Sequence, residues 1–486
     1  GGGEWVLVDG RHVERVGAGD PPEADRLVEL PGTTILPGFI DSHVHLTGTG
    51  LSLRGLDLSV AESREGMIAA TREYLATRPG RVLGVGFDES RWPDPAFPSL
   101  ADLDGLSPDP LILVRTDGYL SLANIAGLEA SALASVEGVE RDAQGRPTGV
   151  LRGRANSDIQ RWYFESLPPP EVQDYQLRAA TLAVSRGVTS LHEMSIPDKR
   201  GRRDLEVLVG HRTDLPVDLA IYVADRDIPY VMDFGLHCIG GDLFLDGSIG
   251  ARTAAVTGPY HDAEGNGSLS YGDDELAEFL HNAHLAGLQV GLHAIGDAAI
   301  EQAVGVWERV YRALDTRGRR HFRARRHRLE HFEMASTDHV ERAAALGLAI
   351  SIQPAFDSTW GGEGGMYQRR LGPERARRMN PFRTLIERGI EVGGGSDTPV
   401  TPLDPMVGVW ALENHHNAAQ RLSREQAVRI FTIGSARLGH QLKKGRLEPG
   451  AAADFAVYEA DPLDVPDPRD LRPILTVSRG RDVYAR

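Results

Sequence analysis

The chain has 486 residues, of which 41% are hydrophobic and 25% are charged, as in a globular protein. Its formal net charge of −16 argues against a nucleic-acid partner, which would require a basic face. No apolar run is long enough to cross a membrane, so no membrane partner is expected. The single cysteine, Cys238, excludes an internal disulfide and favours a reducing, cytoplasmic compartment.

Both ends of the chain have a β-rich pattern. Residues 5–37 alternate short apolar runs with Gly, Asp and Pro, which predicts a small antiparallel sheet. The same pattern returns at residues 454–459 and 474–477. We therefore expect one composite β-sandwich assembled from residues 1–37 and 445–486.

The middle of the chain, residues 38–444, alternates short β-like runs with helical segments such as 274–285, 298–314 and 338–346. The β-like runs are residues 38–46, 188–194, 217–223, 243–246, 289–295, 328–333, 349–354 and 391–397. Eight such units predict an α/β fold, the (β/α)8 or TIM barrel.

The stretch between the first and second barrel runs is too long for one crossover. It contains two further strand-like runs, 83–87 and 111–115, and a Pro-rich segment, 93–110. We expect an inserted subdomain over residues 80–165 that acts as a lid.

Two histidines end the first barrel run, in the segment Asp41-Ser42-His43-Val44-His45. Alternate side chains of a strand share a face, so His43 and His45 point the same way. Two imidazoles at this spacing suit Zn²⁺ or another divalent cation. The carboxyl end of a barrel strand is also where the active sites of barrel enzymes lie.

Three further side chains of ligand type end other barrel runs. His293 ends the fifth run, His331 the sixth and Asp397 the eighth. Because these strand ends meet at one mouth of the barrel, we predict a metal site formed by His43, His45, His293, His331 and Asp397.

Short segments between about residue 35 and residue 464 match those of one enzyme family, in order: LPGFIDSHVHL, FDESRWPDP, PSLADLDGLSPDPLILVRTDG, RPTGVLR, GVTSLHE, LFLDGSIGARTA, HAIGD, RLEH, GGGSD and KGRLEPGAAADFAVYEADPL. The chain resembles the amidohydrolase superfamily, in the branch that includes N-substituted formamide deformylases. The resemblance implies the barrel with its composite sandwich, the metal site, and hydrolysis of a carbon–nitrogen bond other than a peptide bond.

One departure from this branch concerns the metals. Relatives carry a carboxylated lysine that bridges two metals, whereas the matching position here is Asp242, and none of Lys199, Lys443 and Lys444 lies on a barrel strand. Asp242 offers a carboxylate on a shorter side chain. We therefore expect one tightly bound cation and leave a second, held through Asp242, open.

The second departure concerns the substrate. Tyr119 stands where relatives commonly carry histidine, at a position that the resemblance assigns to substrate contact. Trp92 and Arg252 are further candidates for substrate binding, and Asp246 is a candidate ligand or a partner that orients a ligand histidine. The expected partner is a small-molecule substrate, and a homo-oligomer is left open.

These residues permit a hydrolytic mechanism. A bound cation would activate water, with Asp397 as the proton shuttle and His331 or His293 stabilising the oxyanion. His192 and Glu193 are weaker candidates for the pocket wall, and we expect the adjacent pair His415-His416 at the surface.

Two other functions remain open from the sequence. A deaminase of the same superfamily would share the metal ligands, and ammonia release without a carboxylic acid product would identify it. A non-catalytic barrel that binds a ligand is the other alternative, motivated by the missing lysine.

Overall fold

The computed structural model describes residues 3–486, and its central feature is a ring of short parallel strands. The strands are β4 (Phe39–Val44), β11 (Val188–Ser195), β12 (Asp218–Val223), β13 (Cys238–Ile239), β14 (Gln289–Ala294), β15 (Arg328–His331), β16 (Ala349–Ile352) and β17 (Glu391–Gly394). They form two sheets, of order β12-β11-β4 and β13-β14-β15-β16-β17. Gly240 donates to the carbonyl of Val223 and Asp397 to that of His43, which joins the sheets at both junctions. This order is consistent with the expected TIM barrel.

The fourth barrel strand differs from the expectation of a strand at residues 243–246. The strand is β13, and the expected segment keeps only an isolated bridge between Phe244 and His293. Gly240 and Gly241 follow β13 with φ of +81° and +72°. A Cβ at Gly240 would lie 2.0 Å from the carbonyl oxygen of Gly291. The chain therefore leaves the ladder at this point, where only glycine fits.

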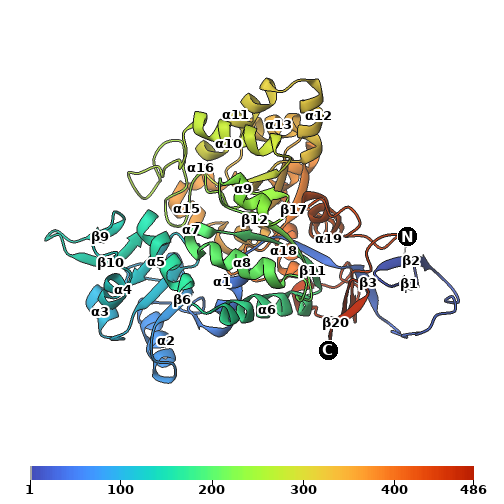
Figure 1. Ribbon diagram of the computed structural model, residues 1–486, viewed down its shortest axis with the longest axis horizontal. Helices are drawn as coiled ribbons and strands as arrows, with labels where there is room; N and C mark the ends of the chain where they lie inside the picture. The colour runs from blue at the N-terminus through green and yellow to red at the C-terminus, as the bar shows by residue number, and fades with distance from the viewer. Residues whose placement is uncertain (1–2) are drawn as a thin grey trace.

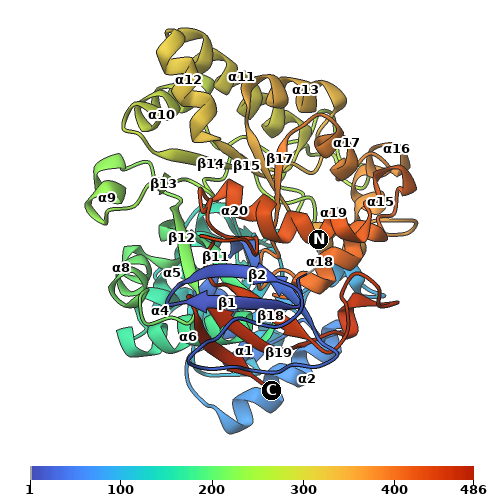
Figure 2. The same ribbon diagram turned by 90° about the vertical axis from the view of Figure 1, so that its right-hand side faces the viewer.

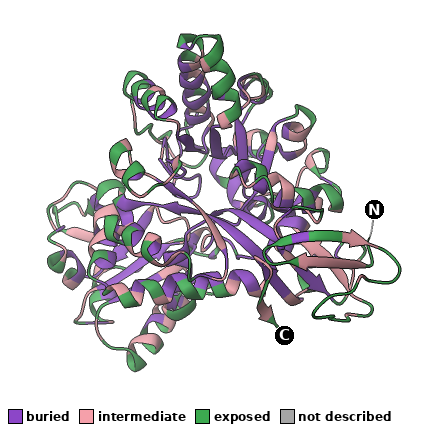
Figure 3. Cartoon of the chain, turned by 45° about the vertical axis from the view of Figure 1, so that its right-hand side comes forward, coloured by how far each residue is buried: buried purple, intermediate pink, exposed green. Residues whose placement is uncertain are grey.

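Helices surround the strands (Figure 1). They include α1 (Leu46–Arg54), α6 (Pro169–Ser185), α7 (Pro197–Arg200), α8 (Arg202–His211), α9 (Ile228–Asp233), α10 (Asp273–Leu285), α11 (Asp297–Ala313), α12 (Thr316–Arg325), α13 (Thr337–Leu346), α14 (Pro354–Trp360), α15 (Met366–Leu371), α16 (Pro373–Ala376), α17 (Phe382–Glu387), α18 (Pro405–Glu413), α19 (Arg424–Arg429) and α20 (Ser435–Leu438). In α11, Ile300, Val304 and Trp307 recur at helical spacing and are buried. Such stripes pack on the strands, which are buried almost throughout (Figure 3).

The segment between the first two barrel strands forms a sheet of its own. Its order is β5 (Leu56–Asp57), β6 (Val82–Phe87), β7 (Leu111–Arg115), β8 (Leu120–Ala123), β10 (Pro147–Arg152), β9 (Val139–Arg141). The helices α2 (Arg64–Thr77), α3 (Leu100–Asp104), α4 (Ile125–Ala130) and α5 (Gly153–Glu165) accompany it. Two hydrophobic clusters lie within this region, which projects from the barrel (Figure 1).

The two ends of the chain meet in one sheet. Its order is β20 (Arg481–Ala485), β19 (Pro473–Ser478), β18 (Phe455–Tyr458), β3 (Thr34–Pro37), so the amino-terminal β3 pairs with the carboxyl-terminal β18. The hairpin of β1 (Trp5–Asp9) and β2 (His12–Gly17) lies over this sheet, and His12 bridges to Ala452 (Figure 2). Within residues 3–486, no helix has the length and hydropathy that a membrane span requires.

Candidate metal centre

Six side chains converge at the carboxyl ends of the barrel strands. The five predicted ligands, His43, His45, His293, His331 and Asp397, are joined there by Asp242. The imidazole Nε2 of His45 lies 3.0 Å from Oδ1 of Asp397 and 3.2 Å from Oδ2 of Asp242. All six side chains are buried.

Asp242 lies at the middle of the cluster. Its Oδ1 is 3.4 Å from Nε2 of His43, 3.6 Å from Nδ1 of His293 and 3.7 Å from Nε2 of His331. Its other oxygen faces His45. The shorter aspartate side chain therefore reaches the histidines of both sides of the site, because the chain turns inward after β13.

Five atoms of this cluster are buried without a hydrogen-bond partner: His43 Nε2, Asp242 Oδ1, His293 Nδ1, His331 Nε2 and Asp397 Oδ1. A buried polar atom left unpaired costs about 1–3 kcal/mol. Imidazole nitrogens and carboxylate oxygens facing a common point are a donor set that a divalent cation satisfies. The residues therefore fit a metal ion.

The second ring nitrogen of each histidine is fixed by another group. His43 Nδ1 donates to Oε2 of Glu330 at 2.9 Å, and His45 Nδ1 donates to the carbonyl of Met194 at 2.9 Å. His331 Nδ1 donates to Oε1 of Gln353 at 2.8 Å. The lone pair of each opposite nitrogen then points into the cluster, as metal-binding histidines require.

His293 has the reverse orientation. Its Nε2 lies 3.2 Å from the carbonyl of Gly247 and 3.1 Å from the hydroxyl of Tyr119. Its Nδ1 faces Asp242. Tyr119 therefore contacts a candidate ligand directly.

The backbone at two candidate ligands is in the left-handed region, with φ of +69° at His331 and +55° at Asp397. Non-glycine residues adopt this conformation rarely, and such strain clusters at functional sites. Beside Asp397, a Cβ at Gly395 would lie 2.6 Å from the backbone nitrogen of His43. The glycine therefore lets the end of β17 approach β4.

The charges of the cluster attract protons or cations. Burial alone would lower the pKa of both His43 and His45. The carboxylates of Asp242 and Asp397 outweigh this effect and raise the pKa of His43 well above 6.5 and the pKa of His45 to about 9. Burial alone would raise the pKa of Asp242, but His43 and the other ligand histidines hold it well below its usual value. A metal ion would replace the protons on these histidines.

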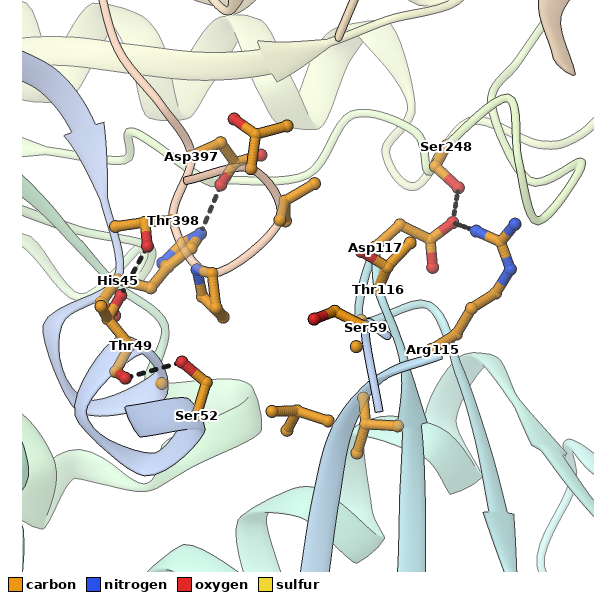
Figure 4. A pocket seen from close by; sticks show the side chains of 18 of the residues that line it. His45, Thr49, Ser52, Ser59, Arg115, Thr116, Asp117, Ser248, Asp397 and Thr398 are labelled. Atoms are coloured by element: carbon orange, nitrogen blue, oxygen red, sulfur yellow. Dashed lines mark hydrogen bonds and ion pairs between the residues drawn. The ribbon is translucent and has the colours of Figure 1, made fainter. Parts of the chain in front are cut away.

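The cluster opens into a cavity of about 760 Å³. His45 and Asp397 form one wall. Arg115 and Asp117 form the facing wall, and they belong to the segment between β4 and β11, which we call the inserted segment (Figure 4). Asp117 accepts hydrogen bonds from Arg115, from Ser248 Oγ at 2.5 Å and from the backbone of Tyr119 at 3.1 Å. The inserted segment and the barrel therefore enclose the cavity together.

The structure does not bring every predicted substrate contact to this cavity. Tyr119 lines it. Trp92 instead lies in the core of the inserted segment, where its Nε1 donates to the carbonyl of Ala61 at 2.8 Å. Arg252 makes two bonds to Asp262, at 2.9 and 2.8 Å, and lies outside the cavity.

Asp246 accepts three backbone N–H groups, from Ala255, Ile295 and Gly296. Its Oδ1 is 3.6 Å from Nε2 of His293, too far for a hydrogen bond. The carboxylate thus holds the backbone after β14, next to His293.

The weaker candidates lie outside the cavity wall. His192 Nδ1 accepts from Arg328 at 3.1 Å, and Glu193 accepts from the backbone of Leu46 at 2.8 Å. The expectation of a surface position for the pair is wrong for His415, because its ring is buried and lies 3.3 Å from Asp357. His416 is half-buried, and its backbone N–H donates to the same carboxylate at 2.9 Å.

Sequence reasoning missed Glu330 and Gln353, which orient ligand histidines, and Lys199, which lines the cavity. A signal for Glu330 was present in Arg328-Leu329-Glu330-His331, where alternation points the carboxylate into the barrel. Gln353 and Lys199 had no comparable pattern.

Comparisons with known proteins give a consistent result. The family model described as the amidohydrolase family matches residues 26–484. The chain is 30% identical to a putative amidohydrolase, YtcJ, of Bacillus subtilis (strain 168), over 96% of this chain and 91% of that protein. It is 24% identical to the N-substituted formamide deformylase of Arthrobacter pascens, over 94% of this chain and 90% of that protein.

Solved structures share the fold. An uncharacterized metal-dependent hydrolase from Pyrococcus horikoshii OT3 superimposes with a TM-score of 0.76 at 26% identity, over 96% of this chain and 95% of that one. Atrazine chlorohydrolase TrzN from Arthrobacter aurescens TC1, complexed with zinc, gives a TM-score of 0.52 at 16% identity, over 99% and 90% of the two chains.

The fold and the site define a metal-dependent hydrolase of carbon–nitrogen bonds with a small-molecule substrate. The chain belongs to the amidohydrolase family, which confirms the resemblance seen in its sequence.

Proposed function

We propose that this protein hydrolyses the carbon–nitrogen bond of a non-peptide amide, with Asp397 as the proton shuttle. The observation that carries the proposal is the convergence of five unpartnered buried atoms, from three histidines and two aspartates, beside a cavity of about 760 Å³, which is large enough for a small molecule. A divalent cation such as Zn²⁺, when bound, would activate water and polarise the substrate carbonyl.

Two groups of residues would hold the metal. One is His43, His45 and Asp397, and the other is His43, Asp242 and His331, with Nδ1 of His293 also facing Asp242. Asp242 has an oxygen toward each side, so it takes the place of the bridging lysine of the resemblance. We propose one tightly held ion and a second whose binding depends on Asp242.

Asp397 is suited to move the proton. Burial alone would raise its pKa, but His43 and His45 lower it, so the carboxylate is ionised at neutral pH and can accept a proton. It also lines the cavity. After bond cleavage it would return this proton to the leaving nitrogen.

Tyr119 and His331 would position the substrate. Both line the cavity, and the hydroxyl of Tyr119 contacts His293. Burial and the nearby carboxylates hold the pKa of Tyr119 well above 10, so the hydroxyl stays protonated and can donate to a carbonyl oxygen. The relative named for N-substituted formamide supports an N-substituted amide as the substrate class.

We also propose a division of labour along the chain. Residues 38–444 would form the catalytic barrel, and the inserted residues 80–165 would close the cavity through Arg115 and Asp117. Residues 1–37 and 445–486 would form the composite sandwich, supported by the pairing of β3 with β18.

The test is a screen of zinc-reconstituted protein against N-acyl and cyclic amides, with detection of the amine, carboxylic acid and ammonia released. We expect an acid and an amine from at least one amide, and no turnover after chelation of the zinc. Ammonia without a carboxylic acid would show a deaminase instead, and ligand binding without any product would show a non-catalytic barrel.

A further inference from the structure

A short helix at the barrel mouth carries two adjacent cations. Helix α7 follows β11 and ends in Lys199 and Arg200, both of which line the cavity. Lys199 is 8% exposed. Its Nζ donates one hydrogen bond, to the carbonyl of Gly118 at 3.2 Å, although an ammonium group has three to give.

Two aromatic rings also lie close to the Lys199 ammonium group. The Nζ lies 4.4 Å from the ring centre of Tyr119 and 4.6 Å from that of Phe244. These contacts stabilise a cation without neutralising it. Burial lowers the pKa of Lys199, an effect that a bound anion would oppose.

Arg200 lies beside the first turn of α1. Its Nη1 is buried without a hydrogen-bond partner, and its Cζ is 5.2 Å from the ring centre of Phe164. A Cβ at Gly48 would lie 2.6 Å from Nη2, so the glycine makes room for the guanidinium group. Gly48 is three residues beyond the candidate ligand His45.

Neither cation has a carboxylate in ion-pair contact anywhere in residues 3–486. The other buried or half-buried cations of the cavity wall are paired: Arg115 with Asp88, Glu89 and Asp117, and Arg186 and Arg472 with Asp404. Lys444, away from the cavity, is paired with Asp218 and Asp454. Lys199, which is buried, and Arg200, which is half-buried, are thus a positive pair without a carboxylate in direct contact. The carboxylates whose charges reach them lie further away: Asp117, Asp198 and Asp242 for Lys199, and Glu193 and Asp204 for Arg200.

This pair is close to the metal centre. The ring of Phe244, which contacts Lys199, is 5.0 Å from the ring of His293, and the hydroxyl of Tyr119 is 3.1 Å from the same imidazole. One aromatic side chain therefore separates the ammonium group from a candidate ligand.

We propose that Lys199 and Arg200 bind an anionic group of the substrate, so that the substrates are amides carrying a carboxylate a few bonds from the carbon–nitrogen bond that is cleaved. The inference rests on the proposed amide hydrolysis. The two cations would fix the anion at one end of the cavity while the amide carbonyl lies at the metal centre. The enzyme would then prefer amides that carry a carboxylate, because an amide without one leaves both cations unpaired.

The test compares N-acyl amino acids with the matching N-acyl amino acid methyl amides, using zinc-reconstituted wild type, Lys199→Met and Arg200→Met. We expect the wild type to prefer the free acids. Each variant should lower kcat/KM for the acids about 10- to 100-fold more than for the neutral partners, mainly through KM, as loss of a charged hydrogen bond does. Lys443→Met and Arg203→Met remove the same charges from exposed positions and should change neither ratio.

Equal losses on acids and neutral partners, or a wild type that prefers the neutral partners, would overturn the proposal. If no amide is hydrolysed at all, the proposed function fails. The anion site is then tested separately, by calorimetric binding of N-acetylglycine and its methyl amide. Binding of N-acetylglycine that Lys199→Met weakens at least tenfold would support the anion site. Equal binding of both compounds to wild type would refute it.

Discussion

At the scale of single residues, the candidate metal centre depends on histidines whose outward-facing ring nitrogens are held by hydrogen bonds. Glu330 holds His43 and is itself held by Arg328, whose Nε and Nη2 donate to it at 2.5 and 2.7 Å. Carboxylate–histidine pairs of this kind raise the basicity of a ligand and fix its ring. The precise direction of each lone pair, and not only the residue type, makes the cluster a candidate metal site.

Asp397→Asn should keep the fold and remove most of the turnover, because an amide cannot accept the proton of water. The expected loss in kcat is about 10²- to 10⁴-fold. Turnover, bound zinc and melting temperature should be measured on one preparation. If Asp397 only stabilises the turn that follows it, the variant will melt earlier and keep near-native turnover per folded molecule.

Asp242→Ala should lower the zinc content by about one ion per chain, because the second ion is proposed to depend on the Asp242 carboxylate. The tight ion should remain on His43, His45 and Asp397. Elemental analysis after dialysis measures both, with the exposed Asp338→Ala as a control. Two tight ions that persist in Asp242→Ala would show that the aspartate does not replace the bridging lysine.

At the scale of elements, a buried histidine links the barrel to its outer helices. His327, directly before β15, stacks on Trp307 of α11 at 4.3 Å, and its Nδ1 accepts the backbone N–H of Val290 at 3.0 Å. Its Nε2 lies 3.1 Å from Nδ1 of His284 on α10. Burial, with His284 and Arg325 nearby, holds the pKa of His327 well below 6.5.

This histidine should make the protein less stable in acid. The unfolded chain binds a proton at His327 below about pH 6.5 while the folded chain does not, so stability is full above that pH and falls below it by about 1.4 kcal/mol per unit. His327→Asn, which cannot titrate, should be less stable near pH 7 and lose less on acidification. Urea unfolding of both proteins from about pH 7.5 to pH 5 gives the comparison; parallel pH profiles would refute it.

Elements were predictable from sequence where a strand carried a regular pattern. Seven of the barrel strands begin within one residue and end within three residues of their predicted runs, because buried parallel strands have continuous apolar sequences. The fourth was misplaced because Gly240 and Gly241 move the chain out of the ladder before Asp242. The sequence identifies Asp242 as the residue at the position of the bridging lysine of relatives. Its contact with the ligand histidines, however, depends on this turn of the backbone.

At the scale of the whole molecule, side chains brought together from distant segments could not be predicted. Lys199 meets Tyr119 and Phe244 only because α7, the segment between β4 and β11, and the segment after β13 share one cavity. Arg252 is engaged by Asp262, a pairing that no spacing rule indicates. The ends of parallel strands, in contrast, must meet, and this topology rule placed the five predicted ligands in one cluster.

The most direct test of the account is anomalous diffraction at the zinc edge from crystals of the zinc-loaded protein. We predict a peak about 2.0–2.2 Å from Nε2 of both His43 and His45, with a carboxylate oxygen of Asp397 or Asp242 also bound. Protein that has been loaded with zinc but shows no peak among these side chains, or a peak only elsewhere, would contradict the metal centre and the hydrolytic function built on it.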